Sequence, residues 1–387
     1  MLRSYVGIAL ALLPALAAGA DQPSAQPIPA NLSAAPAGPT AVSLAARQIL
    51  MESGRYGLKY FPDECLAFVR TVPKIRLLMA AGNSTSLLEG PDMKSLVPLG
   101  QVLKPGKPHA FDNGYAGIGG LARDLRTGTL LAFYHAEDHE DLPMIPGGIP
   151  GFYCSIALAA SNNDGASFQK RGPVISGSLK KDVHGRADQG CGEMSILADK
   201  DQRYLYAYYS DHCRPGGRGV QICLARCPVE EAGATNRWRK YYGGRFDEPG
   251  LGGRDTPVVS AQAMHADAIF PHVTFVEKLN RYVMVFNLIV YKELATPARP
   301  ERSGIYMACS RDGIRWSEPT QLLRIQSVPV RLGTEIGWHP TLRTTSVKGR
   351  TANGWLYYSY SESWGHRPPQ KPHYLVGQPI TFTIAEQ

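Results

Sequence analysis

Four short segments share one pattern of aromatic, aliphatic and β-branched residues, and each follows a turn signal. They occupy residues 130–134, 204–208, 282–286 and 355–359, so their starts are separated by 74, 78 and 73 residues. The turns before them contain Gly, Asn or Asp, as in residues 352–354 (Ala-Asn-Gly), and these residue types punctuate strands. Self-similarity at a fixed period is the sequence signature of a repeat architecture. The pattern therefore predicts a repeated β unit.

Each repeat also shows the same order of strands. An apolar strand precedes the aromatic one, a third strand follows it, and a fourth carries Phe168 or Trp316. The sequence between these strands lacks the periodicity of a long amphipathic helix. Four-stranded antiparallel sheets repeated around a circle form a β-propeller. We therefore predict an all-β chain with this architecture, and a two-sheet jelly roll or sandwich is the alternative.

The number of repeats predicts the number of blades. Residues 75–103 are similar to one more hairpin of a third and a fourth strand, with a turn at Asn83. Added to the four units, this hairpin predicts a five-bladed β-propeller that is closed by joining the N- and C-terminal strands. If one of these repeats contains two short blades, the propeller has six blades.

Two turns between third and fourth strands share a pattern of Ser, Asn or Asp, Gly and an aromatic residue. Residues 161–168 (Ser-Asn-Asn-Asp-Gly-Ala-Ser-Phe) fit the Asp-box pattern, and residues 310–316 (Ser-Arg-Asp-Gly-Ile-Arg-Trp) are a shorter relative of it. In such turns the Asn or Asp side chain caps the turn, and Gly takes a positive φ. We therefore interpret Asn163 and Asp312 as structural residues rather than catalytic ones.

The N-terminal residues predict export. Arg3 precedes a short apolar stretch, and residues 18–20 (Ala-Gly-Ala) form a cleavage pattern, so residues 1–20 are interpreted as a signal peptide. Residues 21–45, rich in Pro and Ala, are expected to form a disordered linker. Residues 46–387 then form a single propeller domain of a periplasmic or secreted protein. No segment of the mature chain is apolar over the length that a membrane span needs.

Composition narrows the classes of partner. The formal net charge is +8, but no basic stripe of the kind that nucleic-acid binding requires is present, and we expect a monomer. All seven Cys residues follow the predicted signal peptide, and export favours disulfides between some of them. No C-x-x-C pair occurs, so the sequence does not predict a Cys-bound metal.

Propeller geometry predicts which polar residues meet. The inner strand of each blade starts at one face of the ring, and its antiparallel neighbour ends at the same face. Carboxylates and imidazoles recur at these positions in four repeats, and we expect them to converge on one axial pocket. At inner-strand starts they are Asp112, Glu193, His265, Asp267, His272 and His339, and at second-strand ends they are His135, Glu137, Asp138, Asp211, His212 and Glu362, together with Asn287.

The blade period, the hairpin at residues 310–316 and these polar positions carry a resemblance to a known group. Residues 75–384 resemble the five-bladed glycosidase propellers of glycoside hydrolase families 43, 32 and 68. Residues 254–257 (Arg-Asp-Thr-Pro) are similar to the R-D-P motif of families 32 and 68 with an inserted Thr, whereas the N-D-P-N-G segment of family 32 is absent. The resemblance implies cleavage of a glycosidic bond by a proton donor and a second carboxylate, both on inner strands of successive blades.

The resemblance assigns roles to four carboxylates. Asp112 is the candidate base and Glu193 the candidate acid, with Asp267 orienting or tuning them. Glu137 is a rival, because His135 stands two residues before it and an imidazole can hold or tune a carboxylate. The structural alternatives are an Asx turn for Asp112, a solvated loop for Glu137 and a local cap for Asp267.

The expected substrate-binding residues combine imidazoles, carboxylates and aromatic rings on which sugars stack. They are His135, Asp211, His265, His272, Trp338, His339, Glu362 and Trp364. A buried, satisfied imidazole is the alternative for His272 and His339. The chemistry requires no cofactor, although the resemblance allows an axial calcium ion, held through water and a His, for which His339 is the candidate.

Together these features predict an exported glycoside hydrolase that acts on an extracellular or cell-envelope polysaccharide. A sialidase-like hydrolase is one alternative, and it would need three Arg side chains, such as Arg123, Arg254 and Arg343, to converge on a substrate carboxylate. The other alternative is a non-catalytic propeller that binds a carbohydrate or a protein partner.

Overall fold

The computed structural model describes residues 37–145, 150–213, 219–295, 300–327, 334–364 and 373–385, and this part of the chain is almost entirely β. It contains no α-helix and five short 3-10 helices, namely η1 (Arg55–Gly57), η3 (Val229–Glu231), η4 (Gln262–Met264), η5 (Glu277–Leu279) and η6 (Tyr291–Ala295). No helix of the described residues is long and apolar enough to cross a membrane. The predicted signal peptide lies outside the described residues.

The described strands fall into five antiparallel units, numbered here in chain order. Unit 1 comprises β3 (Ala67–Arg70), β4 (Ile75–Ala81), β5 (Ser84–Gly90) and β6 (Val97–Leu103). Unit 2 comprises β7 (Tyr115–Arg123), β8 (Leu130–Asp138), β9 (Phe152–Ser161) and β10 (Gln169–Ser176). Unit 3 comprises β11 (Asp188–Ala198), β12 (Tyr204–Asp211), β13 (Gln221–Pro228), β14 (Arg239–Tyr242) and β15 (Arg245–Pro249).

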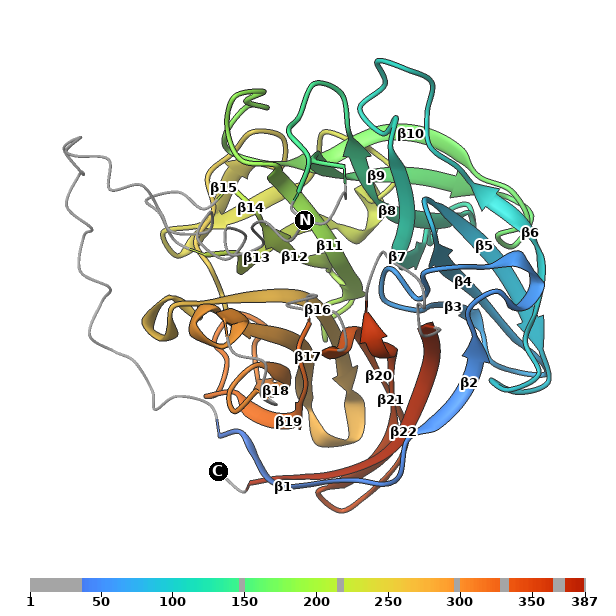
Figure 1. Ribbon diagram of the computed structural model, residues 1–387, viewed down its shortest axis with the longest axis vertical. Helices are drawn as coiled ribbons and strands as arrows, with labels where there is room; N and C mark the ends of the chain where they lie inside the picture. The colour runs from blue at the N-terminus through green and yellow to red at the C-terminus, as the bar shows by residue number, and fades with distance from the viewer. Residues whose placement is uncertain are drawn as a thin grey trace, which may run out of the picture.

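Units 4 and 5 complete the set. Unit 4 comprises β16 (Ala266–Val276), β17 (Arg281–Val290), β18 (Gly304–Ser310) and β19 (Thr320–Arg324). Unit 5 comprises β20 (Thr334–Lys348), β21 (Thr351–Trp364) and β22 (His373–Ile384), together with β1 (Pro39–Leu44) and β2 (Gln48–Glu52). A short parallel pairing of β9 with β11 joins units 2 and 3. In Figure 1 the first strands of the units, β3, β7, β11, β16 and β20, surround the centre of the molecule.

Apolar clusters between neighbouring units hold the ring together. One cluster lies between units 1 and 2, and others follow between units 2 and 3, 3 and 4, and 4 and 5. A further cluster, which includes Leu77 of unit 1 and Leu375 of unit 5, joins the last unit to the first. Each sheet is therefore covered on both faces, and the ring is closed. This confirms the predicted β-propeller and excludes the jelly-roll and sandwich alternatives.

The two ends of the described chain meet in unit 5. Both β1 and β2 pair antiparallel with β22, so N-terminal strands complete the C-terminal sheet as predicted. Because Pro39–Leu44 forms β1, the predicted boundary between linker and domain at residue 45 is wrong. The folded domain begins before that point.

Unit 1 differs from the prediction in one strand. Residues 75–103 were expected to hold a third and a fourth strand, but they hold β4, β5 and β6, which are the second to fourth strands of the unit. The inner strand β3 has only four residues. A strand this short carries too little alternation to be recognised from sequence.

The two turns with the Ser-and-Gly pattern are capped as expected. Asn163 Oδ1 accepts a hydrogen bond from the Ser167 N–H at 3.0 Å. Asp312 Oδ1 accepts hydrogen bonds from the N–H groups of Ile314 and Arg315 at 2.9 and 2.8 Å. These side chains stabilise their own turns and lie outside the inner strands.

The expected disulfides are not present. All seven Cys residues are free thiols, and six of them are buried. A buried, unpaired Cys packs as a small hydrophobic residue, and Cys223, Cys227 and Cys309 belong to apolar clusters of this kind.

Replacement of Leu375 with Ala tests closure of the ring. Leu375 is fully buried in the cluster that joins unit 5 to unit 1, so its truncation should lower the free energy of unfolding by about 2–5 kcal/mol. Urea unfolding followed by circular dichroism measures this loss. Leu99→Ala is the control, because Leu99 is 56% exposed on β6 and should change stability by no more than about 0.5 kcal/mol. Equal effects of the two variants would contradict the closed ring.

Candidate active site

Bulges near the starts of three inner strands bring side chains toward the axis of the ring. The pairing of β11 shifts register at Glu193, that of β16 at Phe270 and that of β20 at His339. These three residues have positive φ angles of 36°, 59° and 52°. Such backbone strain persists only where the surrounding structure fixes it, and bulges re-aim side chains next to active sites. The repeated bulge therefore marks this end of the axis as a candidate site.

Seven acidic and imidazole side chains from four units gather at this end. We call them the axial cluster: Asp63, Glu64, His135, Glu137, Glu193, His212 and His339. Asp63 and Glu64 precede β3, and His135 and Glu137 lie on β8. Glu193 lies on β11, His212 follows β12 directly, and His339 lies on β20. Asp63 and Glu137 are the most exposed members of the axial cluster, with 35% and 14% of their side-chain surface accessible. The cluster is therefore buried at its base and reaches solvent at these two carboxylates.

His135 lies among three carboxylates of the cluster. Its Nδ1 is 2.8 Å from Glu64 Oε1 and 4.0 Å from Glu193 Oε1, and its Nε2 is 3.4 Å from Glu137 Oε1. Gly192 leaves room for the ring, because a Cβ at that position would lie 2.7 Å from His135 Nε2. Burial alone would lower the pKa of His135, but the hydrogen bond with Glu64 and the charges of the nearby carboxylates raise it to about 9. His135 is therefore an imidazolium at neutral pH.

Glu193 is held as a carboxylate by imidazoles. His212 Nε2 lies 2.9 Å from Glu193 Oε2, and His212 Nδ1 lies 3.7 Å from Asp188 Oδ2. Burial alone would raise the pKa of Glu193, but the charge and hydrogen bond of His212, with the charge of His135, lower it to about 2. Glu193 is thus ionised at neutral pH and can act as a base or a nucleophile rather than as an acid.

The pKa of Glu64 is raised, whereas that of Glu193 is lowered. Its burial, at 1% exposed, raises its pKa, and the hydrogen bond and charge of His135 offset only part of this effect, so that the pKa is about 7. The second oxygen, Oε2, has no hydrogen-bond partner among the described residues. It lies against Gly119, where a Cβ would come within 2.8 Å of it. Carboxylates whose environments separate their pKa values are a mark of acid–base sites.

Aromatic rings and a further imidazole pack against the cluster. His139 Nε2 lies 2.6 Å from Glu137 Oε2. The Phe152 ring packs edge-on to His135 and His212, with centroids 6.2 and 5.6 Å apart. The Tyr115 ring is edge-on to His135 at 5.4 Å. A few convergent polar groups with apolar walls are typical of a small-molecule or sugar site.

The structure brings four of the predicted site residues together. His135, Glu137, Glu193 and His339 all belong to the axial cluster. His339 Nε2 lies 3.6 Å from Asp63 Oδ1, and its ring is 4.1 Å from that of Phe270.

Two of the predicted catalytic carboxylates lie elsewhere. Asp112 Oδ2 accepts a hydrogen bond from the Tyr134 hydroxyl at 3.0 Å and forms an ion pair with Lys170. Asp267 Oδ1 accepts hydrogen bonds from a backbone N–H and from the Tyr291 hydroxyl. Both side chains therefore tie a strand start to partners that are distant in sequence, rather than forming the Asx turn or the local cap of their structural alternatives, and neither contacts the axial cluster.

Several predicted binding residues also lie outside the cluster. His265 is exposed at the end of η4, and Glu362 is exposed on β21. Asp211 is buried in unit 3, where its Oδ1 accepts a hydrogen bond from a backbone N–H at 2.9 Å. Trp338 is buried, at 8% exposed. The side chain of Trp364 lies outside the described residues.

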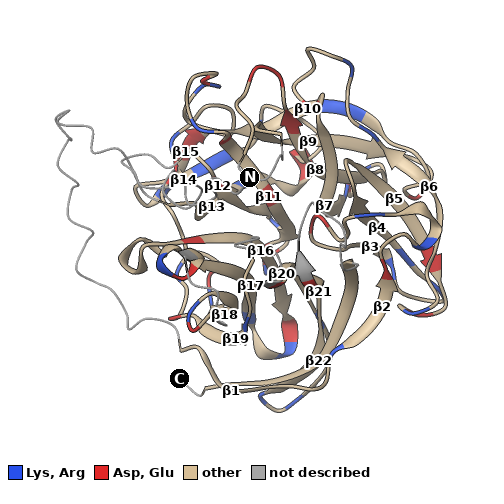
Figure 2. Cartoon of the chain, viewed as in Figure 1, with Lys and Arg blue, Asp and Glu red and all other residues tan. Residues whose placement is uncertain are grey.

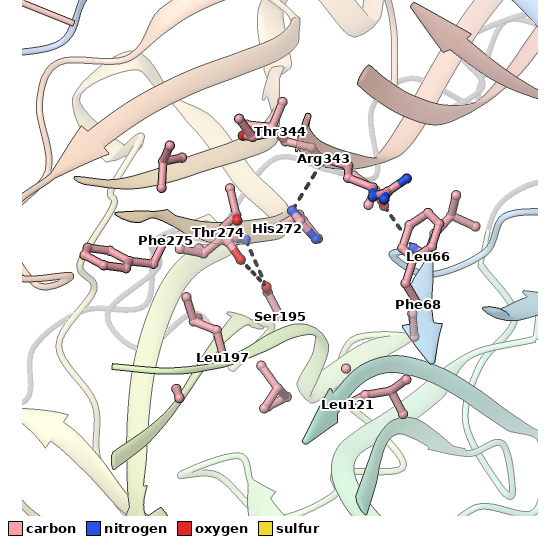
Figure 3. Close-up of a pocket in the computed structure, with 18 of the residues that line it drawn as sticks. Leu66, Phe68, Leu121, Ser195, Leu197, His272, Thr274, Phe275, Arg343 and Thr344 are labelled. Atoms are coloured by element: carbon pink, nitrogen blue, oxygen red, sulfur yellow. Dashed lines mark hydrogen bonds between the residues drawn. The ribbon is translucent and has the colours of Figure 1, made fainter. Parts of the chain in front are cut away.

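A cavity lined by residues of several inner strands lies apart from the cluster (Figure 3). It is a cavity of about 680 Å³, and its lining includes Leu66, Ser195, His272 and Arg343. Cys65 lies between the two regions, because it follows Glu64 directly and its thiol donates hydrogen bonds to the carbonyls of two inner strands, β16 and β20, at 3.5 and 3.6 Å. The cavity is therefore distinct from the axial cluster.

His272 lines this cavity rather than the cluster. Its Nδ1 accepts a hydrogen bond from the Leu342 N–H at 3.3 Å, and burial lowers its pKa to about 4. The ring is thus a neutral, backbone-bonded imidazole, which is the structural alternative for this residue.

Two members of the cluster, Asp63 and Glu64, were not expected at the axial pocket, and a third, His212, was expected there without an assigned role. Asp63 and Glu64 stand before β3, the short strand that the sequence analysis did not identify. A pair of carboxylates directly before the apolar residues 65–69 was the available signal. Among the two residues expected at the end of this second strand, the structure places His212 in the cluster and Asp211 outside it.

The three Arg residues that a sialidase-like site would need do not converge. Arg123 pairs with Asp164, and Arg254 pairs with Glu248 on β15. Arg343 lines the cavity beyond the cluster. In Figure 2 the Lys and Arg segments are dispersed among the Asp and Glu segments around the ring. The described residues thus offer no Arg triad for a substrate carboxylate.

Groups of potential metal ligands in the described residues lie in unit 3. One comprises Cys191, Asp211 and Cys213, and the other comprises Asp211, Cys223 and Asp255. The Lys240 ammonium lies 3.1 Å from Asp255 Oδ2 and 4.0 Å from Cys191 Sγ. A buried cation of the protein therefore already occupies the charge-balancing position between these groups.

The closed ring of antiparallel units is a β-propeller. No family model and no curated protein matches the sequence, but solved structures match the fold. A thermostable family-43 glycoside hydrolase has a TM-score of 0.50 at 13% identity, over 85% of this chain and 96% of that one.

Two further structures give the same result. An α-L-arabinofuranosidase from Lactobacillus brevis has a TM-score of 0.51 at 11% identity, over 84% of this chain and 94% of that one. A family 117 glycoside hydrolase of the marine bacterium Zobellia galactanivorans has a TM-score of 0.55 at 9% identity, over 88% of this chain and 90% of that one. At these identities the likeness shows the fold.

The raised pKa of His135 predicts a pH-dependent stability. Because the pKa of about 9 in the folded state exceeds the ordinary value of 6.5, the contribution is complete below about pH 6.5 and is lost as the pH rises through 9. The melting temperature should therefore fall over this window in the wild type, and fall less in His135→Gln. His109→Gln is the control, because the His109 side chain is 90% exposed. If His135→Gln and wild type show the same slope, the imidazolium assignment is wrong.

Proposed function

We propose that this protein is a glycoside hydrolase and that the axial cluster is its active site. The observation that carries the proposal is the convergence of Glu64, Glu137 and Glu193 around one imidazolium at the axis of the ring. Hydrolysis of a glycosidic bond requires two carboxyl groups with different protonation states on either side of the sugar. The fold that the chain shares with glycoside hydrolases supports the same activity.

Glu193 is the base or nucleophile of the proposed reaction. Its pKa of about 2 keeps it ionised over the whole physiological range, whereas an acid must hold a proton before it can donate one. The role therefore differs from the acid role that the sequence suggested for this residue. His212 holds one of its oxygens at 2.9 Å, and the charges of His212 and His135 stabilise its ionised form.

Glu137 is the proposed proton donor. It is more exposed than Glu64 or Glu193, so it can reach the glycosidic oxygen of a bound sugar. His135 contacts both Glu137 and Glu64, and Glu64, with a pKa of about 7, can take up a proton near neutrality. Glu64 thus positions His135 behind Glu137 without touching the substrate. The predicted binding residue His339 belongs to the same site.

The substrate class follows from the charge of the site. The axial cluster contains four carboxylates and three imidazoles, and no Arg among the described residues pairs with it. A neutral sugar is therefore favoured over a carboxylated one, and the partly exposed ring of Phe152 offers it apolar surface. With the predicted signal peptide, the proposed substrate is a polysaccharide outside the cytoplasm or in the cell envelope.

Isosteric replacement of the two carboxylates tests the proposed chemistry. Glu193→Gln and Glu137→Gln should each lower kcat by about 10²–10⁴-fold on a cleaved oligosaccharide, because each removes one proton-transfer or nucleophilic group. Reducing-end release across a panel of neutral oligosaccharides measures turnover. The configuration of the product, read by NMR, tells whether Glu193 activates a water or attacks the sugar.

Matched controls separate this site from the positions inferred from sequence. Asp267→Asn and Glu248→Gln change carboxylates outside the axial cluster and should keep near wild-type turnover. If both cluster variants remain fully active, the site is wrong. If no glycan is cleaved, yet one raises the melting temperature of the wild type, the protein is a carbohydrate-binding propeller instead.

A further inference from the structure

Two thiols lie beside the pair formed by Glu193 and His212. Cys191 stands two residues before Glu193 on β11, and Cys213 follows His212 directly. The Sγ atoms of Cys191 and Cys213 lie within 4.8 Å of each other and of a carboxylate oxygen of Asp211. The two thiols thus face each other across the hairpin whose strands carry the base and its imidazole partner.

Two hydrogen bonds hold the backbone at His212 and Cys213. The His212 N–H donates a hydrogen bond to the Gly190 carbonyl at 2.9 Å, and the Cys213 N–H donates one to Asp211 Oδ1 at 2.9 Å. Cys213 itself lies beyond the end of β12 and is only partly buried, whereas Cys191 is fully buried. Because the two sulfurs already lie within 4.8 Å of each other, a short movement of the Cys213 side chain brings them to the bonding distance of a disulfide, about 2.05 Å.

We propose that Cys191 and Cys213 are an oxidisable pair, which closes to a disulfide and clamps the ends of β11 and β12 that hold Glu193 and His212. The oxidant is a small-molecule disulfide such as oxidised glutathione. The Cys213 thiolate attacks one of its sulfurs and releases one thiol, and a mixed disulfide forms on Cys213. Cys191 then loses its proton and attacks the Cys213 sulfur, which releases the second thiol. Two protein thiols are oxidised, and one small-molecule disulfide is reduced to two thiols.

The order of attack follows from the two environments. The hydrogen bond from Cys191 lowers the pKa of Cys213 to about 5, and the partly exposed thiolate is the reactive form of cysteine. Burial raises the pKa of Cys191 well above its ordinary value, so this residue stays a thiol until the mixed disulfide forms beside it. Cys213 is thus the entry point, and Cys191 resolves the mixed disulfide.

A disulfide explains the pair better than a bound metal ion does. The third nearby ligand, Asp211, already accepts the Cys213 N–H, and the Lys240 ammonium lies 4.0 Å from Cys191 Sγ. A divalent cation at this position would face that ammonium directly. Oxidation to a neutral disulfide introduces no new charge.

Thiol counting and peptide mapping test the proposal on the full-length protein. After incubation with oxidised glutathione, the wild type should lose two of its seven alkylatable thiols, and non-reducing digestion should give one peptide pair joined through Cys191 and Cys213. Cys213→Ser should lose none. Cys309→Ala, which changes a buried thiol of unit 4, should lose the same two as the wild type.

The melting temperature provides a second readout. Cross-linking removes entropy from the unfolded chain, so the oxidised wild type should melt roughly 5 °C above the reduced form, and this difference should vanish in Cys213→Ser. Retention of all seven thiols, a stable glutathione adduct on Cys213, or a bond from Cys213 to Cys154 would overturn the proposal. So would stoichiometric zinc binding by the reduced pair. The role of the clamp rests on the proposed function, but none of these measurements uses a glycan, so the two can fail separately.

Discussion

One buried imidazolium, that of His135, lies among carboxylates that come from three units of the ring. Burial of a charged group is costly unless it is paired, so the positions of Glu64, Glu137 and Glu193 depend on this ring and its position depends on theirs. The same contacts separate the pKa values of two glutamates, because His212 forms a hydrogen bond with Glu193 in addition to the charge of His135, whereas Glu64 has a hydrogen bond only with His135. The proposed chemistry follows from that asymmetry.

The ring supplies the geometry that the cluster needs. Successive units bury apolar clusters between them, and β1 and β2 complete the last sheet, so the inner-strand starts are fixed around one axis. Bulges at Glu193, Phe270 and His339 then bring three of these residues to the axis at the cost of positive φ angles. Glycine at positions 119 and 192 leaves the space that Glu64 and His135 occupy. The apolar packing between the units therefore stabilises the strained backbone at the centre of the ring.

Much of the fold could be predicted from the sequence, because the aromatic second strands are long and regularly spaced. Closure by the N- and C-terminal strands followed from the same pattern. The short strand β3 could not be recognised, and with it Asp63 and Glu64 were missed. Glu193, Glu137, His135 and His339 were found from their places at strand ends. Asp112 and Asp267 occupy comparable places in the sequence, but their partners, Tyr134, Lys170 and Tyr291, are residues that only the folded structure brings near.

The location of a bound sugar tests the central claim most directly. A crystal structure of the Glu193→Gln variant soaked with an oligosaccharide that the wild type cleaves would show where the scissile bond lies. The account predicts sugar density at the exposed side of the axial cluster, with the glycosidic oxygen within hydrogen-bond distance of Glu137 and the anomeric carbon facing residue 193. Density confined to the cavity lined by His272 and Arg343, or to the outer strands, would contradict it.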